Sequence, residues 1–276
     1  MVNRLSRKEV GQLGYYDCLA YIGLPFIHWG GMKATEELLK LCNVTENSQV
    51  LVVGCGSGFT SIQVAETFGC QVMGIDISEQ GIAAAKERAK KSSASDKVTF
   101  KIGSAYQMPF EDNRFEIAIS EFVLTFLDKD RIMKEVCRVL EQGGRLGINE
   151  LVIAENIPQK PRQKIVDTLK EYSDMVELNM EPLTANQWKN NVQNAGFDVV
   201  KTEEMPAKEA RKPDTIKALG KAGFIKYALR AAYYYTLNSN VRKYVNTAKK
   251  LENILLWRKE ISQYVGNILA VGTKIS

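Results

Sequence analysis

Residues 49–76, QVLVVGCGSGFTSIQVAETFGCQVMGID, decide the fold of this chain. The run QVLVV at 49–53 is apolar and rich in β-branched residues, which is typical of a strand buried in a parallel sheet. Gly54–Gly58 is a glycine-rich turn, and 59–68 returns to helical spacing. A second strand, VMGIDI at 72–77, follows. The stretch therefore predicts a strand, a tight turn, a helix and a second strand.

The same alternation continues outward from this stretch. Residue patterns predict further strands and helices, with strands at 98–102, 115–120, 145–151, 197–201 and 264–274, and helices at 33–42, 80–91, 129–140, 164–177 and 185–194. Strands that alternate with helices in this way predict an α/β fold with a doubly wound sheet. We expect a mostly parallel, seven-stranded, Rossmann-like sheet with helical additions.

Those additions fall at two places in the chain. Residues 1–44 read as a helical N-terminal segment that forms a lid. Residues 206–262 carry mostly helical signals, including FIKYALRAAYYYTL, and read as an insertion between the last two strands. The core is then expected at 45–205 plus 262–276.

Composition excludes several classes of protein. The chain has 276 residues, of which 45% are hydrophobic and 25% charged, as in soluble globular proteins. No apolar run reaches membrane-spanning length, and the charged N-terminus has no signal-peptide core, so we expect a cytoplasmic protein. Five cysteines without a CxxC spacing and a single histidine, His28, argue against disulfides, a metal site and a His–Asp–Ser triad.

Charge is unevenly distributed along the chain. The formal net charge is +5, yet Lys208–Lys259 alone holds 13 Lys and Arg against 3 Asp and Glu. A basic segment can indicate an anionic partner, although a solvated set of helices is the commoner explanation. Lys226 and Arg230 are four residues apart on an apolar helix, which leaves a weak contact with a membrane surface open.

The glycine-rich turn and an acid at the end of the second strand predict the ligand. Glycine allows the tight turn GCGSG and a close approach of ligand to backbone. The helix that follows presents unpaired N–H groups, and Asp76 can accept both hydroxyls of a ribose. Phe59 stands where a dinucleotide fingerprint has its third glycine, which argues against a nicotinamide oxidoreductase. The pattern favours a nucleoside with a short amino-acid tail.

Four stretches together resemble a known family. VLVVGCGSG, GIDIS, GSAYQMPF and FEIAISEFVLTFLDKDRIMKEVCRVLEQGGRLGI are similar, in this order, to the class I S-adenosylmethionine-dependent methyltransferases, and closest to their small-molecule branch. The resemblance covers about 45–152 strongly. HWGGMKATEELLKLC at 28–42 also resembles the helix that leads into the fold in sterol- and lipid-type members.

The resemblance implies S-adenosylmethionine as cofactor and assigns it nine contacts. Asp76 would hold the ribose hydroxyls, Ile77 would pack on the adenine, and Glu121 would lie near the methionine end. The remaining residues would line the methionine tail and ribose (Gly54, Cys55, Gly56, Gly58) or the adenine edge (Ser104, Ala105).

Two positions depart from the pattern of the family. Val52 stands where the family usually has an acid that orders the methionine amine, and Ser104 stands where it usually has an Asp that reads adenine. These departures leave open a cofactor-binding protein of the same fold that has no catalytic activity.

Three residues are candidates for catalysis: Glu150, His28 and Tyr16. Glu150 and Glu121 follow neighbouring predicted strands, so both can face one pocket, where they would bind a cationic acceptor or act as a base. They can equally be ordinary polar residues at strand ends. His28 is either a base or a structural hydrogen-bonding group, and Tyr16 either lines the acceptor pocket or packs in the core.

The main hypothesis is a methyltransferase that acts on a small or lipid-like acceptor, with residues 1–44 and 206–262 as a lid over the pocket. Methyl transfer from a sulfonium is an in-line displacement, which depends mostly on alignment. The acceptor atom, N, O, S or C, stays open. The alternative is a methyltransferase of protein side chains that docks through the basic insertion. No motif for a flipped base is present, which argues against nucleic acid.

Overall fold

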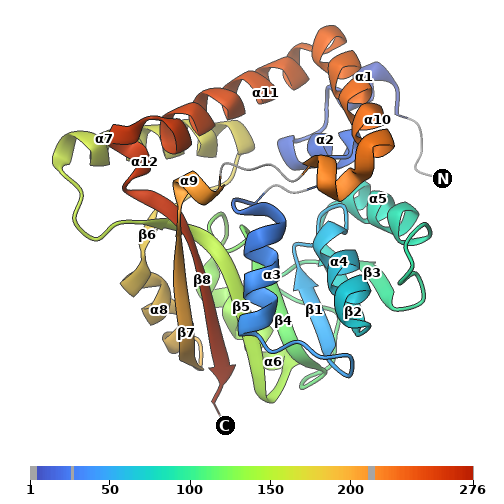
Figure 1. Cartoon of the computed structure of the whole chain (residues 1–276), viewed down its shortest axis with the longest axis vertical. Helices are drawn as coiled ribbons and strands as arrows, with labels where there is room; N and C mark the ends of the chain where they lie inside the picture. The colour runs from blue at the N-terminus through green and yellow to red at the C-terminus, as the bar shows by residue number, and fades with distance from the viewer. Residues whose placement is uncertain (1–4, 26–27, 211–214, 276) are drawn as a thin grey trace.

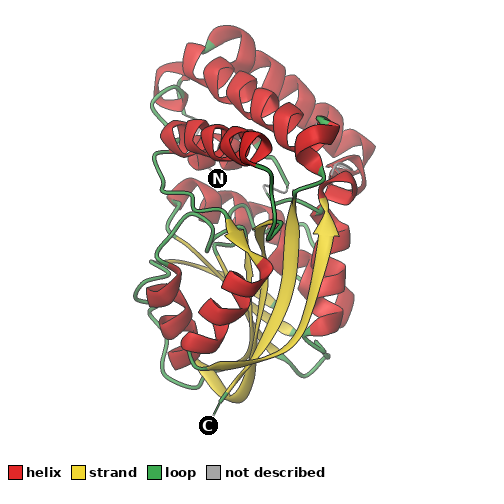
Figure 2. Cartoon of the chain, turned by 90° about the vertical axis from the view of Figure 1, so that its left-hand side faces the viewer, coloured by secondary structure: helices red, strands yellow, loops and turns green. Residues whose placement is uncertain are grey.

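The structure is a computed structural model that describes residues 5–25, 28–210 and 215–275. A sheet of eight strands forms its centre, and helices cover both faces and one end (Figures 1 and 2). The strands are β1 (Gln49–Val53), β2 (Gln71–Asp76), β3 (Val98–Ile102), β4 (Phe115–Glu121), β5 (Leu140–Ile153), β6 (Leu183–Thr184), β7 (Phe197–Pro206) and β8 (Val265–Lys274).

Helices make up most of the remaining described chain. They are α1 (Arg7–Val10), α2 (Tyr15–Ile22), α3 (Gly31–Leu41), α4 (Phe59–Phe68), α5 (Glu79–Ala89), α6 (Lys129–Val139), α7 (Gln159–Val176), α8 (Ala185–Asn194), α9 (Ala207–Ala210), α10 (Thr215–Leu237), α11 (Ser239–Glu252) and α12 (Lys259–Ser262), with a π-helical turn at Asn253–Trp257. Within the described residues, we find no helix whose length and apolar character would let it cross a membrane.

The strand order is β3-β2-β1-β4-β5-β8-β7, and β6 pairs with β5 beside this path. Strands β1 to β5 run parallel, whereas β8 is antiparallel to both β5 and β7. The predicted doubly wound, mostly parallel α/β sheet is therefore confirmed. The carboxyl ends of β1 to β5 meet at one edge of the sheet, where ligands bind in folds of this kind.

Two details of the sheet differ from the prediction. The sheet has an eighth strand, because Leu183 and Thr184 pair with Val152 and Ile153. Thr184 also serves as the N-cap of α8. A pairing of two residues is too short for a hydrophobic pattern to reveal.

Strand β5 is also longer than the predicted 145–151. Helix α6 ends at Val139, and Leu140 already pairs with Phe115. A register shift follows before Arg145, and Gly143 has a φ of 73° within it. Gly143 therefore lies in an irregularity inside the strand and not in a loop between α6 and β5.

Helices lie on both faces of the sheet (Figure 2), and an apolar core lies between the helices and the sheet on each face. On one face, Leu38 of α3 and Ile62 of α4 pack against the strands. On the other, Met133 of α6 and Trp188 of α8 do so, and the Trp188 indole donates to the Leu151 carbonyl at 2.7 Å. These cores hold the strand ends in fixed positions.

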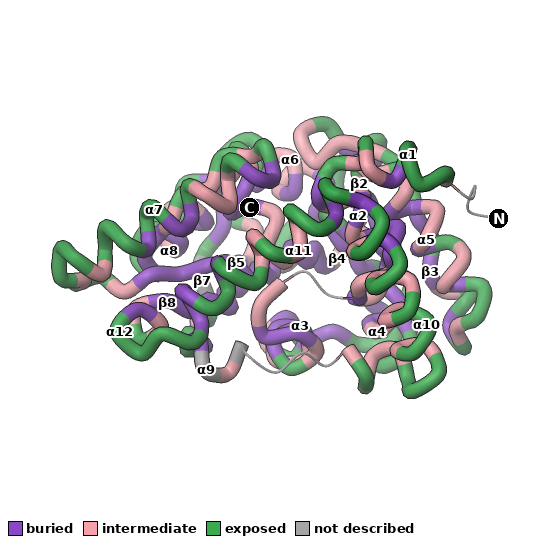
Figure 3. The backbone as a smooth tube through the Cα atoms, turned by 90° about the horizontal axis from the view of Figure 1, so that it is seen from above, coloured by how far each residue is buried: buried purple, intermediate pink, exposed green. Residues whose placement is uncertain are grey.

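The carboxyl-end side of the sheet carries its own layer of helices (Figures 1 and 3). Here Val10 of α1 and Tyr21 of α2 share a core with Tyr234 of α10 and Val241 of α11. The N-terminal segment and the insertion, far apart in sequence, thus form one structure above the strand ends. Their division from the core as separate domains stays a prediction.

Candidate functional site

The glycine-rich turn after β1 lies at the centre of the carboxyl edge. Gly54 has a φ of 66°, and a side chain there would begin 2.3 Å from a methyl group of Val123. Gly56 has a φ of 50°, and a side chain there would meet no atom within 4 Å. Helix α4 starts at Gly58 without a side-chain cap, so its first N–H groups are available to a ligand. At Gly56 the turn therefore leaves room for a ligand beside its backbone.

Asp76 braces this turn from the end of β2. One of its carboxylate oxygens accepts from the Gly56 N–H at 2.7 Å, and the other accepts from the Ser78 N–H at 2.8 Å. Burial raises the pKa of Asp76, against these hydrogen bonds, and Asp17 adds to the rise. A carboxylate has about four acceptor positions, so both oxygens can still accept from ribose hydroxyls.

Two apolar side chains are uncovered beside Asp76. Ile77 is 77% exposed and Ile102, which follows on β3, is 49% exposed. They lie next to the loop that contains Ser104 and Ala105, where the Ser104 hydroxyl accepts from the Tyr106 N–H at 3.2 Å. An exposed apolar surface of this kind next to Asp76 has room for a planar ring.

Cys55 and Val52 do not face this surface. Both are buried in the core cluster that also contains Leu38. Burial raises the pKa of the Cys55 thiol well above its ordinary value, so the side chain is an unreactive thiol. Cys55 thus contributes backbone and a small volume to the turn.

Glu121, at the end of β4, is the centre of a buried polar network. Its carboxylate accepts from the hydroxyls of Thr35 and Thr60, each at 2.9 Å, and from the Asn149 side-chain amide at 3.2 Å. The His28 Nε2 atom lies 3.5 Å from Glu121 Oε2, and the two side chains are 7% and 5% exposed. Three segments that are distant in sequence, 28–35, the start of α4 and β5, therefore converge on this one carboxylate.

The network extends from Glu121 towards β8. The Asn149 amide lies 3.4 Å from His28 Nδ1 and donates to the Trp29 carbonyl at 3.3 Å. Its oxygen accepts from Asn267 at 2.7 Å. His28 thus packs against Glu121 and Asn149, and the structure brings together two of the predicted site residues, His28 and Glu121.

Glu150 has different surroundings from Glu121. It is fully buried, and its oxygens accept from the N–H groups of Val123, Leu124 and Thr125 at 3.1, 3.0 and 2.9 Å. The Thr125 hydroxyl donates to it at 2.6 Å. Burial raises the pKa of Glu150 to about 7. Asn149 pairs with Glu121 in the sheet, and Glu150, the next residue of β5, points to the opposite face. Glu150 therefore does not join Glu121, and its hydrogen bonds order the loop after β4.

Tyr16 lies in a group of aromatic rings above the ends of β4 and β5. Its ring is 5.1 Å from that of Tyr15 and 5.7 Å from that of Phe126. Tyr172 of α7 and Tyr244 of α11 complete the group, at 5.8 and 5.6 Å from Tyr15. We call these five residues the aromatic cluster. Burial raises the pKa of Tyr16 well above its ordinary value, so its hydroxyl stays protonated.

The N-terminal segment closes over the glycine turn. The Ser78 hydroxyl, at the start of α5, donates to Asp17 of α2. The Ser57 hydroxyl donates to the Leu24 carbonyl at 3.3 Å. Sequence reasoning did not single out Asp17, and it also missed the partners of Glu121 (Thr35, Thr60, Asn149), because no local spacing links residues so far apart.

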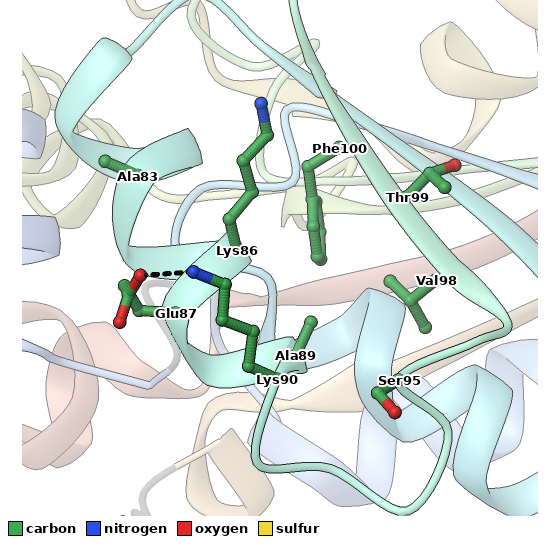
Figure 4. A pocket seen from close by; sticks show the side chains of 9 residues that line it. All are labelled: Ala83, Lys86, Glu87, Ala89, Lys90, Ser95, Val98, Thr99 and Phe100. Carbon is green, nitrogen blue, oxygen red and sulfur yellow. Dashed lines mark hydrogen bonds and ion pairs between the residues drawn. The ribbon is translucent and has the colours of Figure 1, made fainter. Parts of the chain in front are cut away.

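Two hollows lie outside the surface formed by the glycine turn and Asp76. One, of about 520 Å³, is lined at the sheet edge by α5 and β3, with Lys86, Lys90 and Phe100 in its wall (Figure 4). The other, of about 710 Å³, opens beside the aromatic cluster and includes Phe126, Tyr106 and Thr125. Neither hollow is lined by the glycine turn, Asp76 or Glu121.

Comparisons with known proteins give one consistent family. Residues 44–196 match the model of a family described as a methyltransferase domain. An uncharacterised protein of Haemophilus influenzae is 30% identical over 201 residues, which are 72% of this chain and 76% of that protein. Methyltransferase GfsG of Streptomyces halstedii is 33% identical over 124 residues, and the match spans 45% of each chain, less than half the length of that relative.

A solved structure shares the fold over nearly the whole chain. Phosphoethanolamine N-methyltransferase 2 of Haemonchus contortus, in complex with phosphomonomethylethanolamine and S-adenosylhomocysteine, superposes with a TM-score of 0.66 at 21% identity. The match covers 99% of this chain and 61% of that one.

Proposed function

The chain belongs to the class I S-adenosylmethionine-dependent methyltransferases, and from this premise we propose that it transfers a methyl group to a small, largely apolar or lipid-like acceptor. When bound, S-adenosylmethionine supplies a methyl group already activated for in-line displacement. The protein then has to align donor and acceptor and exclude water, because alignment alone can supply much of the rate. The observation that carries the proposal is the meeting of the glycine turn, Asp76 and the buried Glu121 at one edge of the sheet.

Asp76 and the turn would hold the nucleoside. Its carboxylate accepts the two ribose hydroxyls while it keeps its bonds to the Gly56 and Ser78 N–H groups. Ile77 and Ile102 flank the adenine and lose their exposure to water when it binds. Burying apolar area stabilises binding by about 25 cal/mol per Å².

Glu121 would replace the acid that the glycine motif lacks. Val52 pairs with Ile119 in the sheet, and Glu121 is the next residue on the same face of β4. The Glu121 carboxylate thus lies on the same face of the sheet as the side chain of residue 52, where the family usually has an acid, and nearer to the carboxyl ends of the strands. Thr35, Thr60 and Asn149 orient the carboxylate. The carboxylate would accept a hydrogen bond from the ammonium group of the methionine tail. This placement of Glu121 supports cofactor binding although Val52 is not an acid.

His28 would act through Glu121. Its ring lies against both Glu121 and Asn149, and it comes from the segment that leads from the lid into α3. We propose that His28 fixes Glu121 and accepts a proton only where an acceptor must lose one. Glu150, whose oxygens accept from the loop after β4, would position that loop and not touch the substrate.

The acceptor would lie between the glycine turn and the aromatic cluster. Tyr16 and Phe126 present aromatic area with one hydroxyl above the ends of β4 and β5, which suits an apolar acceptor with few polar groups. Tyr244 of the insertion and Tyr15 of the N-terminal segment meet in the same cluster. Both additions would therefore shield the acceptor and select it, as a lid does.

Two measurements test the proposal. Calorimetry should show binding of S-adenosylhomocysteine and none of NAD; the reverse result would refute the assignment of the cofactor. Transfer of a labelled methyl group should then be followed into an organic extract and into acid-precipitated protein. Label in the extract supports a small acceptor, label in protein favours the side-chain alternative, and tight binding without any transfer favours a non-catalytic protein.

A further inference from the structure

Helix α10 is apolar on two sides, and the molecule covers only one of them. On the inner side, Tyr227, Ala231 and Tyr234 pack against α2, in the core that contains Tyr21. A helix that is apolar all round is normally buried all round. The outer side of α10 therefore needs an explanation.

The outer side carries a row of exposed apolar residues at helical spacing. Ile225, Leu229, Tyr233 and Leu237 follow one another at intervals of four residues and are 58%, 68%, 53% and 42% exposed. Residues four apart lie on one face of a helix, so the four form a continuous strip. We call it the outer ridge. Figure 3 shows α10 at the margin of the helical layer, with its tube coloured as exposed and intermediate.

The surroundings of the outer ridge are positively charged. From residue 215 to 251 the sequence has eight Lys and Arg and no Asp or Glu. Some of these basic side chains have partners within the molecule. Arg230 stacks on the Tyr21 ring at 4.2 Å, and Lys250 forms an ion pair with Glu171 at 2.7 Å. Lys221 and Lys226, on α10 itself, are exposed, and no ion pair is recorded for either in the part of the chain that is described.

We propose that the outer ridge docks the protein on an anionic lipid surface. Apolar side chains flanked by lysines can enter the boundary between headgroups and acyl chains, while the ammonium groups meet anionic headgroups. A second copy of this chain is a poor occupant, because its ridge would bring like charges together. The ridge is a convex strip on one helix, which suits insertion into a lipid surface.

Docking of this kind would place the aromatic cluster near a supply of apolar molecules. Helix α11 follows α10 directly and contributes Tyr244 to the cluster. The docking proposal nevertheless stands apart from the proposed function, because it concerns binding to lipid and not methyl transfer.

Sedimentation with vesicles tests the proposal. The full chain should sediment with vesicles of phosphatidylglycerol and phosphatidylcholine, not with phosphatidylcholine alone, and salt should weaken the binding. Leu229→Ser with Tyr233→Ser should weaken binding about tenfold or more through lost apolar burial. Lys221→Glu with Lys226→Glu should do so through reversed charge.

A matched control keeps the test specific. Val166→Ser removes an apolar side chain of α7 that is 41% exposed, and it should leave vesicle binding unchanged. Binding of S-adenosylhomocysteine, measured on each variant, reports whether the fold is intact. Equal binding to neutral vesicles, or wild-type binding by both ridge variants, would overturn the proposal. So would concentration-dependent self-association that the ridge variants abolish, since the ridge would then cover a second copy.

Discussion

Replacing Glu121 by Gln separates its charge from its shape. The Gln oxygen can still accept from Thr35 and Asn149, which donate to Oε1 at 2.9 and 3.2 Å. The new amide can donate to the Thr60 hydroxyl, which rotates freely. The fold should therefore be retained, and the substitution should weaken the binding of a ligand that carries an ammonium group.

The expected loss of binding affinity follows from the strength of a hydrogen bond between the ligand ammonium group and Glu121. A hydrogen bond to a charged group contributes about 1.5–3 kcal/mol. Since about 1.4 kcal/mol corresponds to a factor of ten, the Kd for S-adenosylhomocysteine should rise about 10- to 150-fold. Calorimetry gives the Kd, and the thermal midpoint without ligand gives the stability of the same sample.

Glu116→Gln is the matched control. Glu116 lies on the same strand, near its amino end, and forms a partly exposed ion pair with Arg145. Its loss should change stability by no more than about 1 kcal/mol and leave the Kd unchanged.

The reasoning on Glu121 fails if Glu121→Gln binds S-adenosylhomocysteine as tightly as the wild type does. If Glu121→Gln and Glu116→Gln weaken binding equally, the effect is one of overall charge and the assignment of the ammonium group is also wrong.

Three further changes follow from the site. Asp76→Asn should weaken binding of S-adenosylhomocysteine about tenfold or more in calorimetry, because the ribose loses a charged acceptor; unchanged affinity would contradict that role. The folded-state pKa of Glu150 is raised from 4.5 to about 7, so the folded state holds the extra proton between these values and the free energy of unfolding should fall as the pH rises through them. Urea titrations at a series of pH values should show this slope in the wild type and its reduction in Glu150→Gln; identical slopes would refute it. Tyr16→Phe should leave the thermal midpoint nearly unchanged and raise the KM for the acceptor if the hydroxyl binds it; an equal loss of stability would assign Tyr16 to packing.

Short stretches of the sequence predict much of the fold. The apolar run of β1, the positive-φ glycines and the acid at the end of β2 are consecutive features, and each element forms where the pattern predicts it. The local spacing of apolar residues predicted the structure less well where pairing between strands decides the conformation. Leu183 joined the sheet and Gly143 became part of β5 because neighbouring strands offered hydrogen bonds that no pattern within either segment shows.

The site divides in the same way. The sequence by itself determined the glycine turn, Asp76 and the family, since these rest on residues close together in the chain. Only the tertiary structure decided that Glu121 and Glu150 face opposite ways, and that Thr35, Thr60 and Asn149 converge on Glu121. It also joined the N-terminal segment to the insertion through Tyr21 and Tyr234. The physical reason is that hydrogen bonds and packing act between atoms that are near in space, while a sequence pattern records only neighbours along the chain.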